Sequence, residues 1–253
     1  MEKIGLGLLG FGTVGAGVVD VLQKNGALLA GRIGLELVLR RIADLDLESD
    51  RGVHVDRSIM TTDALSVIED PDVRVVVELI GGTKAARELT LRALELHKPV
   101  VTANKALLAE HGGEIFAAAD RNETDLYYEA SVGGGIPIIR SLREGLVANH
   151  IERIVGILNG TCNYILTRME DENMSFQAVL KEAQKAGYAE AEPSLDIDGI
   201  DTAHKAVILA SLAYGFPVPM SGICIEGIRD ISPLDIQFAC ELGYRIKQLA
   251  VIK

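Results

Sequence analysis

Leu8-Leu9-Gly10-Phe11-Gly12-Thr13-Val14-Gly15-Ala16-Gly17 decides the fold of this chain, because its glycines recur at a fixed spacing between two apolar segments. Residues 4–9 form a short apolar run that is typical of a buried strand. Residues 14–22 carry apolar side chains at helical spacing. The Gly-x-Gly-x-x-Gly motif therefore lies at a strand-to-helix turn, which is the context in which it binds a dinucleotide.

Each glycine of the motif has a distinct task in such a turn. Gly10 would permit the tight turn, Gly12 would let backbone N–H groups approach a pyrophosphate, and Gly15 would let the helix lie close to the strand. The N-terminus of the helix would offer further donors to the phosphates. We expect Asn25-Gly26 to end this helix. The residues predicted to bind the cofactor here are Gly10, Phe11, Gly12, Thr13, Val14 and Gly15.

Strand and helix patterns alternate along the chain up to about residue 130. Apolar strand candidates lie at 4–9, 35–43, 73–80, 99–103 and 126–130, with helical patterns at 63–69, 85–97 and 106–121. Alternation of this kind predicts parallel strands joined by right-handed crossovers, with ligands at the carboxyl ends of the strands. We therefore expect a Rossmann-type doubly wound α/β domain over residues 1–130.

The regular alternation of strand and helix patterns ends after the glycines at 133–135. Helices are predicted at 136–148, 161–171, 176–187, 202–214 and 234–242, and strands at 150–158, near 221–228 and at 244–252. Few strands separated by long helices are typical of an α+β arrangement. Residues 131–253 are thus predicted to form a second domain of α+β type, to which substrate binding and dimerisation are assigned on the features described below. Because the chain stops within a strand pattern, we expect this domain to be incomplete at its C-terminus.

Composition narrows the class of protein. The net charge of −11 argues against binding to a nucleic-acid backbone. No stretch reaches the roughly 18 uncharged apolar residues of a membrane span, and no signal peptide is evident. The three cysteines, Cys162, Cys224 and Cys240, have no metal-like spacing. We expect a cytoplasmic protein, and the 48% of hydrophobic residues suggests surface buried in a homodimer.

Asp44 follows the second strand candidate and could accept the ribose hydroxyls of NAD. It lies 29 residues after Gly15 rather than the usual roughly 20, so the intervening helix and loop must be long. Arg40 and Arg41 could equally hold the 2′-phosphate of NADP. A solvated acidic loop is the alternative interpretation, and the choice between NAD and NADP stays open.

Two further segments carry polar side chains suited to chemistry. Asn104-Lys105 follows a buried strand, where a lysine could hold an anion or transfer a proton, although it could also be an ordinary surface lysine. Residues 187–205 place five acids before a helix in which Asp201 and Lys205 are four residues apart on one face. Alone, this pair is most often an ordinary ion pair.

Five sequence blocks together resemble the homoserine dehydrogenase family, and the last two are specific to it. They are Gly10-Phe11-Gly12-Thr13-Val14-Gly15, Thr102-Ala103-Asn104-Lys105, Glu129-Ala130-Ser131-Val132-Gly133-Gly134-Gly135-Ile136-Pro137, Asn159-Gly160-Thr161-Cys162-Asn163-Tyr164, and Gly187-Tyr188-Ala189-Glu190 followed by Asp201-Thr202-Ala203-His204-Lys205. Members of this family interconvert L-homoserine and L-aspartate 4-semialdehyde with NAD(P), in threonine and methionine biosynthesis. The resemblance implies the same reaction for this chain.

The resemblance also implies roles for individual residues. Lys205 would be the catalytic proton donor and acceptor, Lys105 would lie beside nicotinamide and substrate, and Gly187 would lie beside the cofactor. Glu190 and Asp201, together with Asp196, would bind the amino-acid substrate. A sodium ion would be held by Glu129 and by the backbone carbonyls of Val132, Gly134 and Ile136. Hard cations do prefer such oxygen ligands.

Two other functions compete with this interpretation. An aldehyde-oxidising dehydrogenase would use Cys162 as its nucleophile, but no histidine neighbours that cysteine in the sequence. A non-catalytic dinucleotide-binding module would not need Lys105, Glu190, Asp201 and Lys205 together. Family members continue beyond the point at which this chain stops, and many add a regulatory ACT domain, so the activity of this 253-residue chain needs to be measured.

Overall fold

The computed structural model describes all 253 residues and divides into two compact units, Met1–Pro137 and Ile138–Lys253. Unit 1 contains the glycine motif, and unit 2 contains Lys205. Residues 131–137, which the sequence assigns to the second domain, belong to unit 1. None of the helices is both long and apolar enough to cross a membrane. All three cysteines are free thiols.

Unit 1 is built on a six-stranded sheet in which every neighbouring pair of strands is parallel. The strand order is β3-β2-β1-β4-β5-β6, which is the order of a doubly wound dinucleotide-binding fold. The predicted Rossmann-type sheet is therefore confirmed. The strands are β1 (Glu2–Leu9), β2 (Leu35–Ala43), β3 (Met60–Thr61), β4 (Val75–Glu78), β5 (Val100–Thr102) and β6 (Leu126–Tyr127). The sequence missed only β3, which has two residues.

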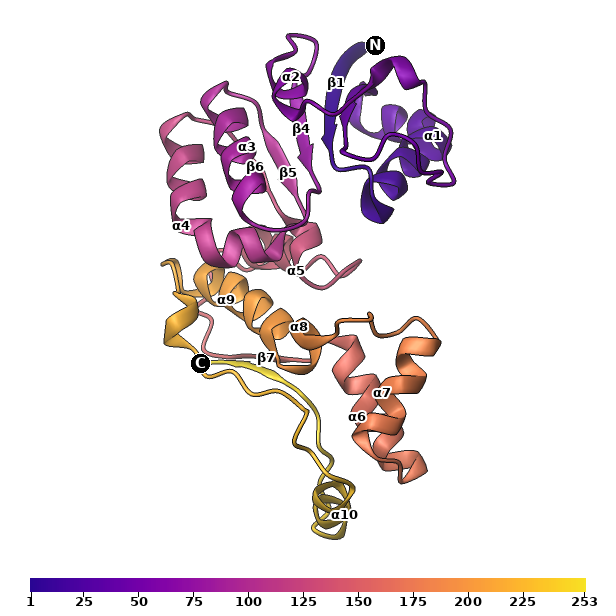
Figure 1. The fold of residues 1–253 in the computed structure, drawn as a ribbon. Helices are drawn as coiled ribbons and strands as arrows, with labels where there is room; N and C mark the ends of the chain where they lie inside the picture. The colour runs from indigo at the N-terminus through magenta and orange to yellow at the C-terminus, as the bar shows by residue number, and fades with distance from the viewer. The chain divides into compact units, whose positions relative to one another are not determined.

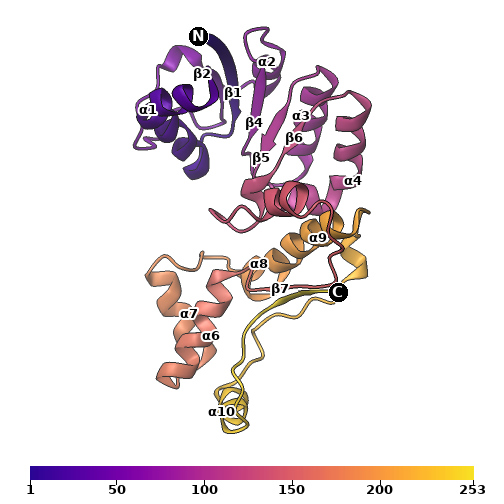
Figure 2. The same cartoon turned by 180° about the vertical axis from the view of Figure 1, so that it is seen from behind.

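Helices cover both faces of this sheet. Because parallel crossovers are right-handed, the helix between β1 and β2 lies on one face, and those between β4, β5 and β6 lie on the other. The helices α3 and α4 accordingly pack against each other, apart from α1 (Figures 1 and 2). The helices are α1 (Thr13–Ile33), α2 (Ala64–Glu69), α3 (Lys84–Glu95) and α4 (Lys105–Arg121), with short 3-10 turns η1 (Arg57–Ile59) and η2 (Glu129–Ser131).

The predicted end of the first helix at Asn25-Gly26 is wrong. The helix α1 runs on to Ile33 and ends at Gly34, which adopts a left-handed conformation with φ 74°. One glycine inside an exposed helix costs only about 1 kcal/mol relative to alanine. The alanine- and leucine-rich stretch after Gly26 outweighs that cost, so the helix continues through it.

Unit 2 is mainly helical, with one antiparallel pair of strands, β7 (Ile154–Gly156) and β8 (Ala250–Ile252). Its buried core joins apolar side chains of four helices, including Leu166, Val179, Ile197 and Ile236. The helices are α5 (Ile138–Arg140), the π-helical turn η3 (Ser141–Gly145), α6 (Gly160–Glu172), α7 (Phe176–Lys185), α8 (Ser194–Ile197), α9 (Ile200–Tyr214), the 3-10 turn η4 (Met220–Gly222) and α10 (Pro233–Glu241).

The strand predicted near residues 221–228 is absent, and that prediction is wrong. The segment packs as irregular chain against α8, where the Ile228 N–H donates to the Ile197 carbonyl over 2.8 Å. A Cβ atom at Gly227 would lie 2.5 Å from that carbonyl oxygen. The segment therefore uses its backbone to meet a helix end rather than another strand. The strands predicted at 150–158 and 244–252 exist but are shorter.

Candidate functional site

The glycine turn of unit 1 separates glycines that the fold requires from one that it does not. Gly10 has φ +94°, and a Cβ there would lie 2.6 Å from the Leu79 carbonyl oxygen. A Cβ at Gly15 would lie 2.2 Å from the carbonyl oxygen of Gly10. Gly12 has an ordinary φ of −73° and would place its Cβ with no atom within 4 Å. Packing therefore explains Gly10 and Gly15, and open space remains at Gly12.

That open space lies at the N-terminus of α1. Gly12 is the N-cap residue of this 21-residue helix and supplies no side-chain cap, so the first turn keeps backbone N–H groups for a ligand. Such a terminus favours negative charge. The turn with Phe11, Thr13 and Val14 therefore fits a pyrophosphate.

A cavity of about 400 Å³ adjoins the turn. Its walls include Gly10, Gly12, Asp44, Ile80 and Leu89, and its only charged lining residue is Asp44. Apolar walls with a single carboxylate suit a nucleoside, whose base is apolar on its faces and whose ribose hydroxyls can donate hydrogen bonds.

Asp44 is held against the glycine turn. Its carboxylate accepts hydrogen bonds from the backbone N–H groups of Phe11 and Asp46, the latter over 2.8 Å. The unusual spacing of 29 residues is explained by the 21 residues of α1. The Asp44 carboxylate is thus fixed in the wall of the cavity.

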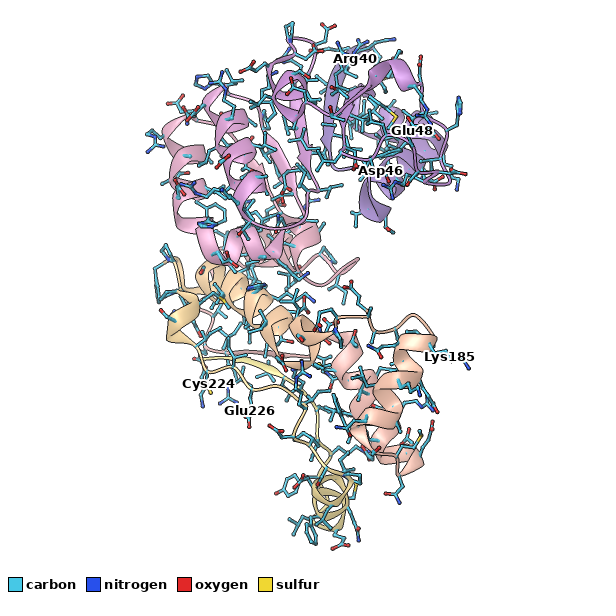
Figure 3. The ribbon with its side chains drawn as sticks, viewed as in Figure 1. Arg40, Asp46, Glu48, Lys185, Cys224 and Glu226 are labelled. Atoms are coloured by element: carbon cyan, nitrogen blue, oxygen red, sulfur yellow. The ribbon has the colours of Figure 1, made fainter.

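The structure does not bring Arg40 or Arg41 to this cavity. The Arg41 guanidinium donates to the Asp70 carboxylate over 3.0 Å and holds the pKa of that carboxyl below its usual range. Arg40 is exposed, and Figure 3 shows it well apart from Asp46 within unit 1. Neither side chain lines the cavity.

Asn104 ties the end of β5 to the loop after β4. Its carbonyl oxygen accepts from the Leu107 N–H over 3.0 Å and caps α4, while its amide nitrogen donates to the carbonyls of Ile80 and Gly82. Lys105 is the first residue of α4 and is half-buried. The lysine thus stands at the carboxyl edge of the sheet, as predicted.

A buried carboxyl group that sequence reasoning missed lies at the same edge. Glu78 ends β4 and is fully buried, which raises the pKa of its carboxyl. It accepts hydrogen bonds from the Thr102 hydroxyl over 2.6 Å and from the Ile80 N–H over 2.8 Å. The position of an acidic residue at the end of an apolar strand is the sequence feature that could have indicated it.

The loop that carries the predicted cation ligands lies wholly in unit 1. Gly133 and Gly134 both have positive φ, at 83° and 59°. Backbone hydrogen bonds within the loop use the carbonyls of Tyr128, Glu129 and Gly133. The carbonyls of Val132 and Gly134 take part in none of these bonds. The chain has no group of three His, Cys, Asp or Glu side chains that could hold a metal ion. Any cation in this loop would therefore depend on backbone oxygens beside the Glu129 carboxylate.

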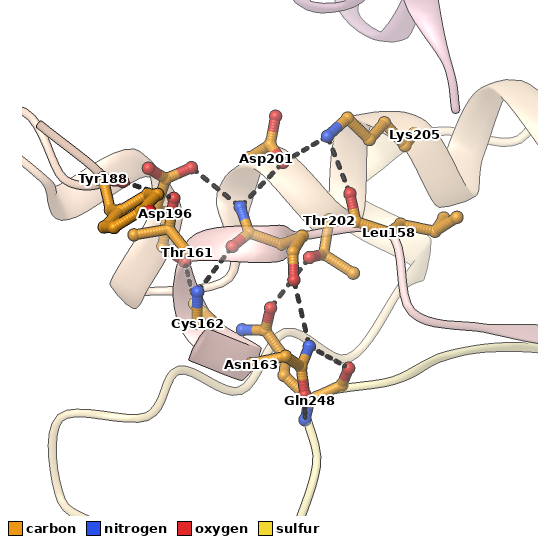
Figure 4. A network of polar contacts seen from close by, with 11 residues as sticks. Leu158, Thr161, Cys162, Asn163, Tyr188, Asp196, Asp201, Thr202, Lys205 and Gln248 are labelled. Atoms are coloured by element: carbon orange, nitrogen blue, oxygen red, sulfur yellow. Dashed lines mark hydrogen bonds and ion pairs between the residues drawn. The ribbon is translucent and has the colours of Figure 1, made fainter. Parts of the chain in front are cut away.

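The Lys205–Asp201 pair is the centre of a polar cluster in unit 2 (Figure 4). The Lys205 ammonium donates to the Asp201 carboxylate over 2.6 Å and to the Leu158 carbonyl over 2.7 Å. The side chains are 19% and 8% exposed, respectively. Because an ammonium has three donors, one remains for a ligand. This geometry differs from that of a solvated helix ion pair.

Asn159 joins two carboxylates in the same cluster. Its amide nitrogen donates to Asp196 over 2.7 Å and to Asp201 over 2.9 Å. Its carbonyl oxygen accepts from the Cys162 N–H and caps α6. Asn159 begins one of the five sequence blocks described above, but the sequence alone gives it no functional role. An Asn-Gly-Thr start before a helix signals an N-cap, whereas the contact with the acids depends on folding.

A second set of hydrogen bonds joins the helices of the cluster to the segment before β8. Asn163 donates to the carbonyls of Asn159 and Gln248 and accepts from the Gln248 N–H, each over 3.0 Å. The Thr202 hydroxyl donates to the Gln248 side-chain oxygen over 2.9 Å. The segment before β8 thereby supports α6 and α9. Because Asn163 and Gln248 are 85 residues apart in the sequence, no local pattern indicates this contact.

Glu190 and Gly187 lie outside the cluster. Both are exposed, and the backbone carbonyl of Glu190 accepts a hydrogen bond from the Gln184 side-chain amide over 3.0 Å. Gly187 has φ +79° and follows the end of α7. The structure thus brings together Asp196, Asp201 and Lys205, but not Glu190.

Cys162 cannot serve as the nucleophile of an aldehyde-oxidising dehydrogenase. Its side chain is fully buried, and its thiol contacts the Asp196 carbonyl oxygen over 3.1 Å. Burial, with the nearby carboxylates of Asp196 and Asp201, raises its pKa to about 12. The thiolate that such chemistry needs is therefore scarce.

Comparison with known proteins identifies both units. Residues 137–253 match the family described as homoserine dehydrogenase, and residues 10–129 match the homoserine dehydrogenase NAD-binding domain. The homoserine dehydrogenase of Neisseria gonorrhoeae is 47% identical over all of this chain, which covers 58% of that protein. The chain spans 56 to 59% of the length of the first curated relatives it matches.

Solved structures agree with these matches. A homoserine dehydrogenase from Thiobacillus denitrificans has a TM-score of 0.93 and 47% identity over 99% of this chain and 58% of that one. An Archaeoglobus fulgidus protein described as a candidate homoserine dehydrogenase has a TM-score of 0.88 and 34% identity over 99% of this chain and 80% of that one. A hyperthermophilic archaeal homoserine dehydrogenase in complex with NADPH has a TM-score of 0.76 and 28% identity over 91% and 75% of the two chains.

Proposed function

Because this chain belongs to the homoserine dehydrogenase family, we propose that it interconverts L-homoserine and L-aspartate 4-semialdehyde with NAD(P). The observation that carries this proposal is the Lys205 ammonium, fixed by Asp201 and the Leu158 carbonyl with one donor left over. A positioned amine of this kind can move a proton to or from a substrate oxygen. The proposed pathway role is the supply of homoserine for threonine and methionine.

The cofactor would be held by the glycine turn of unit 1. The backbone N–H groups at the start of α1 would bind the pyrophosphate over Gly12, and Asp44 would accept the ribose hydroxyls. The bound nicotinamide would accept or supply the hydride. Arg41 could reach a 2′-phosphate only by leaving Asp70. The related archaeal enzyme forms a complex with NADPH, which supports a dinucleotide cofactor for this chain.

Lys205 would perform the proton transfer. In the direction of reduction, its ammonium would donate a proton to the developing alkoxide oxygen at C4 of the substrate. In oxidation, the neutral amine would take the hydroxyl proton as hydride leaves C4. Asp201 and the Leu158 carbonyl hold the nitrogen in place through both directions. Lys105 is proposed to lie beside the nicotinamide and the substrate, and Gly187 is proposed to lie beside the cofactor.

Asp196, Asp201 and Glu190 would bind the amino group of the substrate. Asp201 is already paired with Lys205, whereas no ion pair forms at the half-buried Asp196. A carboxylate without a cation beside it suits the substrate ammonium. Among the three acids, the structure favours Asp196 as the main contact.

A sodium ion would support the loop at residues 129–137. Glu129 would supply charge, and the carbonyls of Val132, Gly134 and Ile136 would supply further oxygen ligands. The positive φ of Gly133 and Gly134 gives the loop a tight bend. Such a bend fits a carbonyl cage better than a regular helix or strand would.

A homodimer through unit 2 is proposed from its exposed apolar surface. Val155 and Val251 on the paired strands β7 and β8 are 52% and 54% exposed. Strand edges with apolar faces are favourable sites for association. The expected location of such an enzyme is the cytoplasm.

The experiment that tests the function is homoserine-dependent reduction of NAD or NADP by this chain, followed by absorbance. A full-length family member serves as the positive control. Turnover with either cofactor supports the proposal. Binding of the cofactor without homoserine-dependent reduction would instead indicate a non-catalytic dinucleotide-binding module.

A further inference from the structure

The side-chain amide of Asn159 makes three hydrogen bonds within unit 2, two of them to acids that the catalytic proposal involves. Both N–H donors go to carboxylates, Asp196 over 2.7 Å and Asp201 over 2.9 Å. The carbonyl oxygen accepts from the Cys162 N–H over 2.8 Å. Asn159 is only 4% exposed, so water does not compete for these contacts. Its two ends have unlike partners, which fixes the orientation of the amide.

The two carboxylates come from different helices. Asp196 lies in α8 and Asp201 in α9, and Lys205 pairs with Asp201 alone. Like charges held close together repel each other. The shared amide group lies between them and offers a donor to each. It therefore opposes the separation of the two acids.

The backbone of Asn159 is held in place by the side chain of Asn163. Asn163, one helical turn later, donates to the Asn159 backbone carbonyl and to the Gln248 carbonyl, each over 3.0 Å. Its side-chain oxygen also accepts from the Gln248 N–H. The amide of Asn159 thus projects from a fixed backbone toward the acids.

We propose that Asn159 is a positioning residue for the reaction: its amide holds Asp201 against Lys205 and orients Asp196 toward the substrate ammonium. This inference rests on the proposed function and assigns Asn159 no contact with the reacting atoms. It acts through the two acids. Removing its N–H donors should impair homoserine turnover while leaving the glycine turn of unit 1 intact.

A purely structural role as the N-cap of α6 makes a different prediction. Asparagine, aspartate and serine cap helices about equally well. The variants N159D and N159S keep an oxygen for the Cys162 N–H. N159S removes both N–H donors and leaves one hydroxyl on a shorter side chain, and N159D replaces the donors with a third carboxylate. A capping role would leave both variants active, whereas positioning requires both to be impaired.

We expect kcat/KM for homoserine to fall about 10- to 100-fold in N159S, because two hydrogen bonds to charged groups are lost. The loss in N159D should be larger, since the added carboxylate repels both acids. Both variants should lower kcat and raise KM for homoserine, with NADH affinity within about twofold of the original chain. The matched control is S175A, which removes the exposed cap of α7 and touches no carboxylate of the cluster. Its kinetic constants should not change.

A second readout does not depend on activity. In a chain labelled with nitrogen-15, the NMR signals of the Asn159 side-chain NH2 group are identified by their loss in N159S. Both of its protons should exchange with solvent far more slowly than those of the exposed Asn25. Exchange as fast as that of Asn25 would overturn the inference even if the unsubstituted chain proved inactive. If that chain turns over homoserine, wild-type kinetics in folded N159S and N159D would overturn it too.

Discussion

The glycine turn of unit 1 and the acidic cluster of unit 2 would recognise their proposed ligands by opposite means. The turn works through backbone N–H groups and empty space at Gly12, within a stretch of six residues. The cluster would work through the side chains of Asn159, Asp196, Asp201 and Lys205, which lie up to 46 residues apart in the chain. Apart from the pair of Asp201 and Lys205 on one helix, their contacts depend on tertiary folding. Local backbone geometry can be predicted from a motif, whereas a side-chain cluster depends on packing that a motif does not encode.

The largest expected effect is the loss of turnover in K205A. Removing the amine removes the proposed proton donor and acceptor, so kcat should fall roughly 10²- to 10⁴-fold. Steady-state kinetics with homoserine measures this. The matched control is K185A, because Lys185 is exposed at the end of α7 and is labelled in Figure 3. A comparable loss in both variants would mean that general destabilisation, not proton transfer, explains the result.

The next effect separates the acids that could bind the substrate ammonium. Asp196 is half-buried beside the cluster, and Glu190 is exposed outside it. Loss of one charge from a buried pair costs roughly 2–5 kcal/mol, so D196N should lose about thirty-fold or more in kcat/KM. E190Q should lose less, and E192Q is its exposed control. For a substrate analogue without the amino group, the D196N loss should shrink. A greater loss in E190Q than in D196N would reverse the proposed ranking.

Within the glycine turn, stability and binding should separate. G15A forces a Cβ to within 2.2 Å of the Gly10 carbonyl oxygen, and we expect it to destabilise the chain by about 1–3 kcal/mol. G12A meets no atom within 4 Å and should stay within about 1 kcal/mol of the original chain. Urea unfolding measures both. Equal destabilisation would show that Gly12, too, is required by packing.

The smallest effect concerns the cysteines and leaves catalysis aside. The pKa of Cys162 is raised to about 12 by burial, so its thiol stays protonated below that pH. Cys224 and Cys240 are exposed. At pH 8, iodoacetamide should therefore label those two in the native chain and all three after denaturation. Peptide mass spectrometry reads the result, and rapid native labelling of Cys162 would contradict the buried geometry.

Much of unit 1 could be predicted because its signals are local. The alternation of strands and helices, the glycine turn, and Asp44 all follow from spacing. The end of α1 was mispredicted because one glycine weakens a helix by less than the following residues strengthen it. Glu78 was missed because its importance comes from burial against Thr102.

Unit 2 was predicted less completely, for a physical reason. Asp201 and Lys205 were found because they are four residues apart on one helix. The segment at 221–228 has strand-like composition, but Ile228 pairs its backbone with α8. The contacts of Asn159 with Asp196 and Asp201 join helices that no local pattern relates. Such contacts become visible only when the helices pack.

The measurement that tests the account most directly compares cofactor binding and turnover in G12V and K205A. A valine side chain at position 12 would occupy the space proposed for the pyrophosphate, so G12V should raise the Kd for NADH at least about 100-fold. K205A should keep a Kd near that of the original chain and lose homoserine turnover. Fluorescence titration of NADH, with steady-state kinetics on the same samples, gives both quantities. Equal weakening of NADH binding in the two variants would contradict the division between a backbone site for the cofactor and a side-chain site for the substrate.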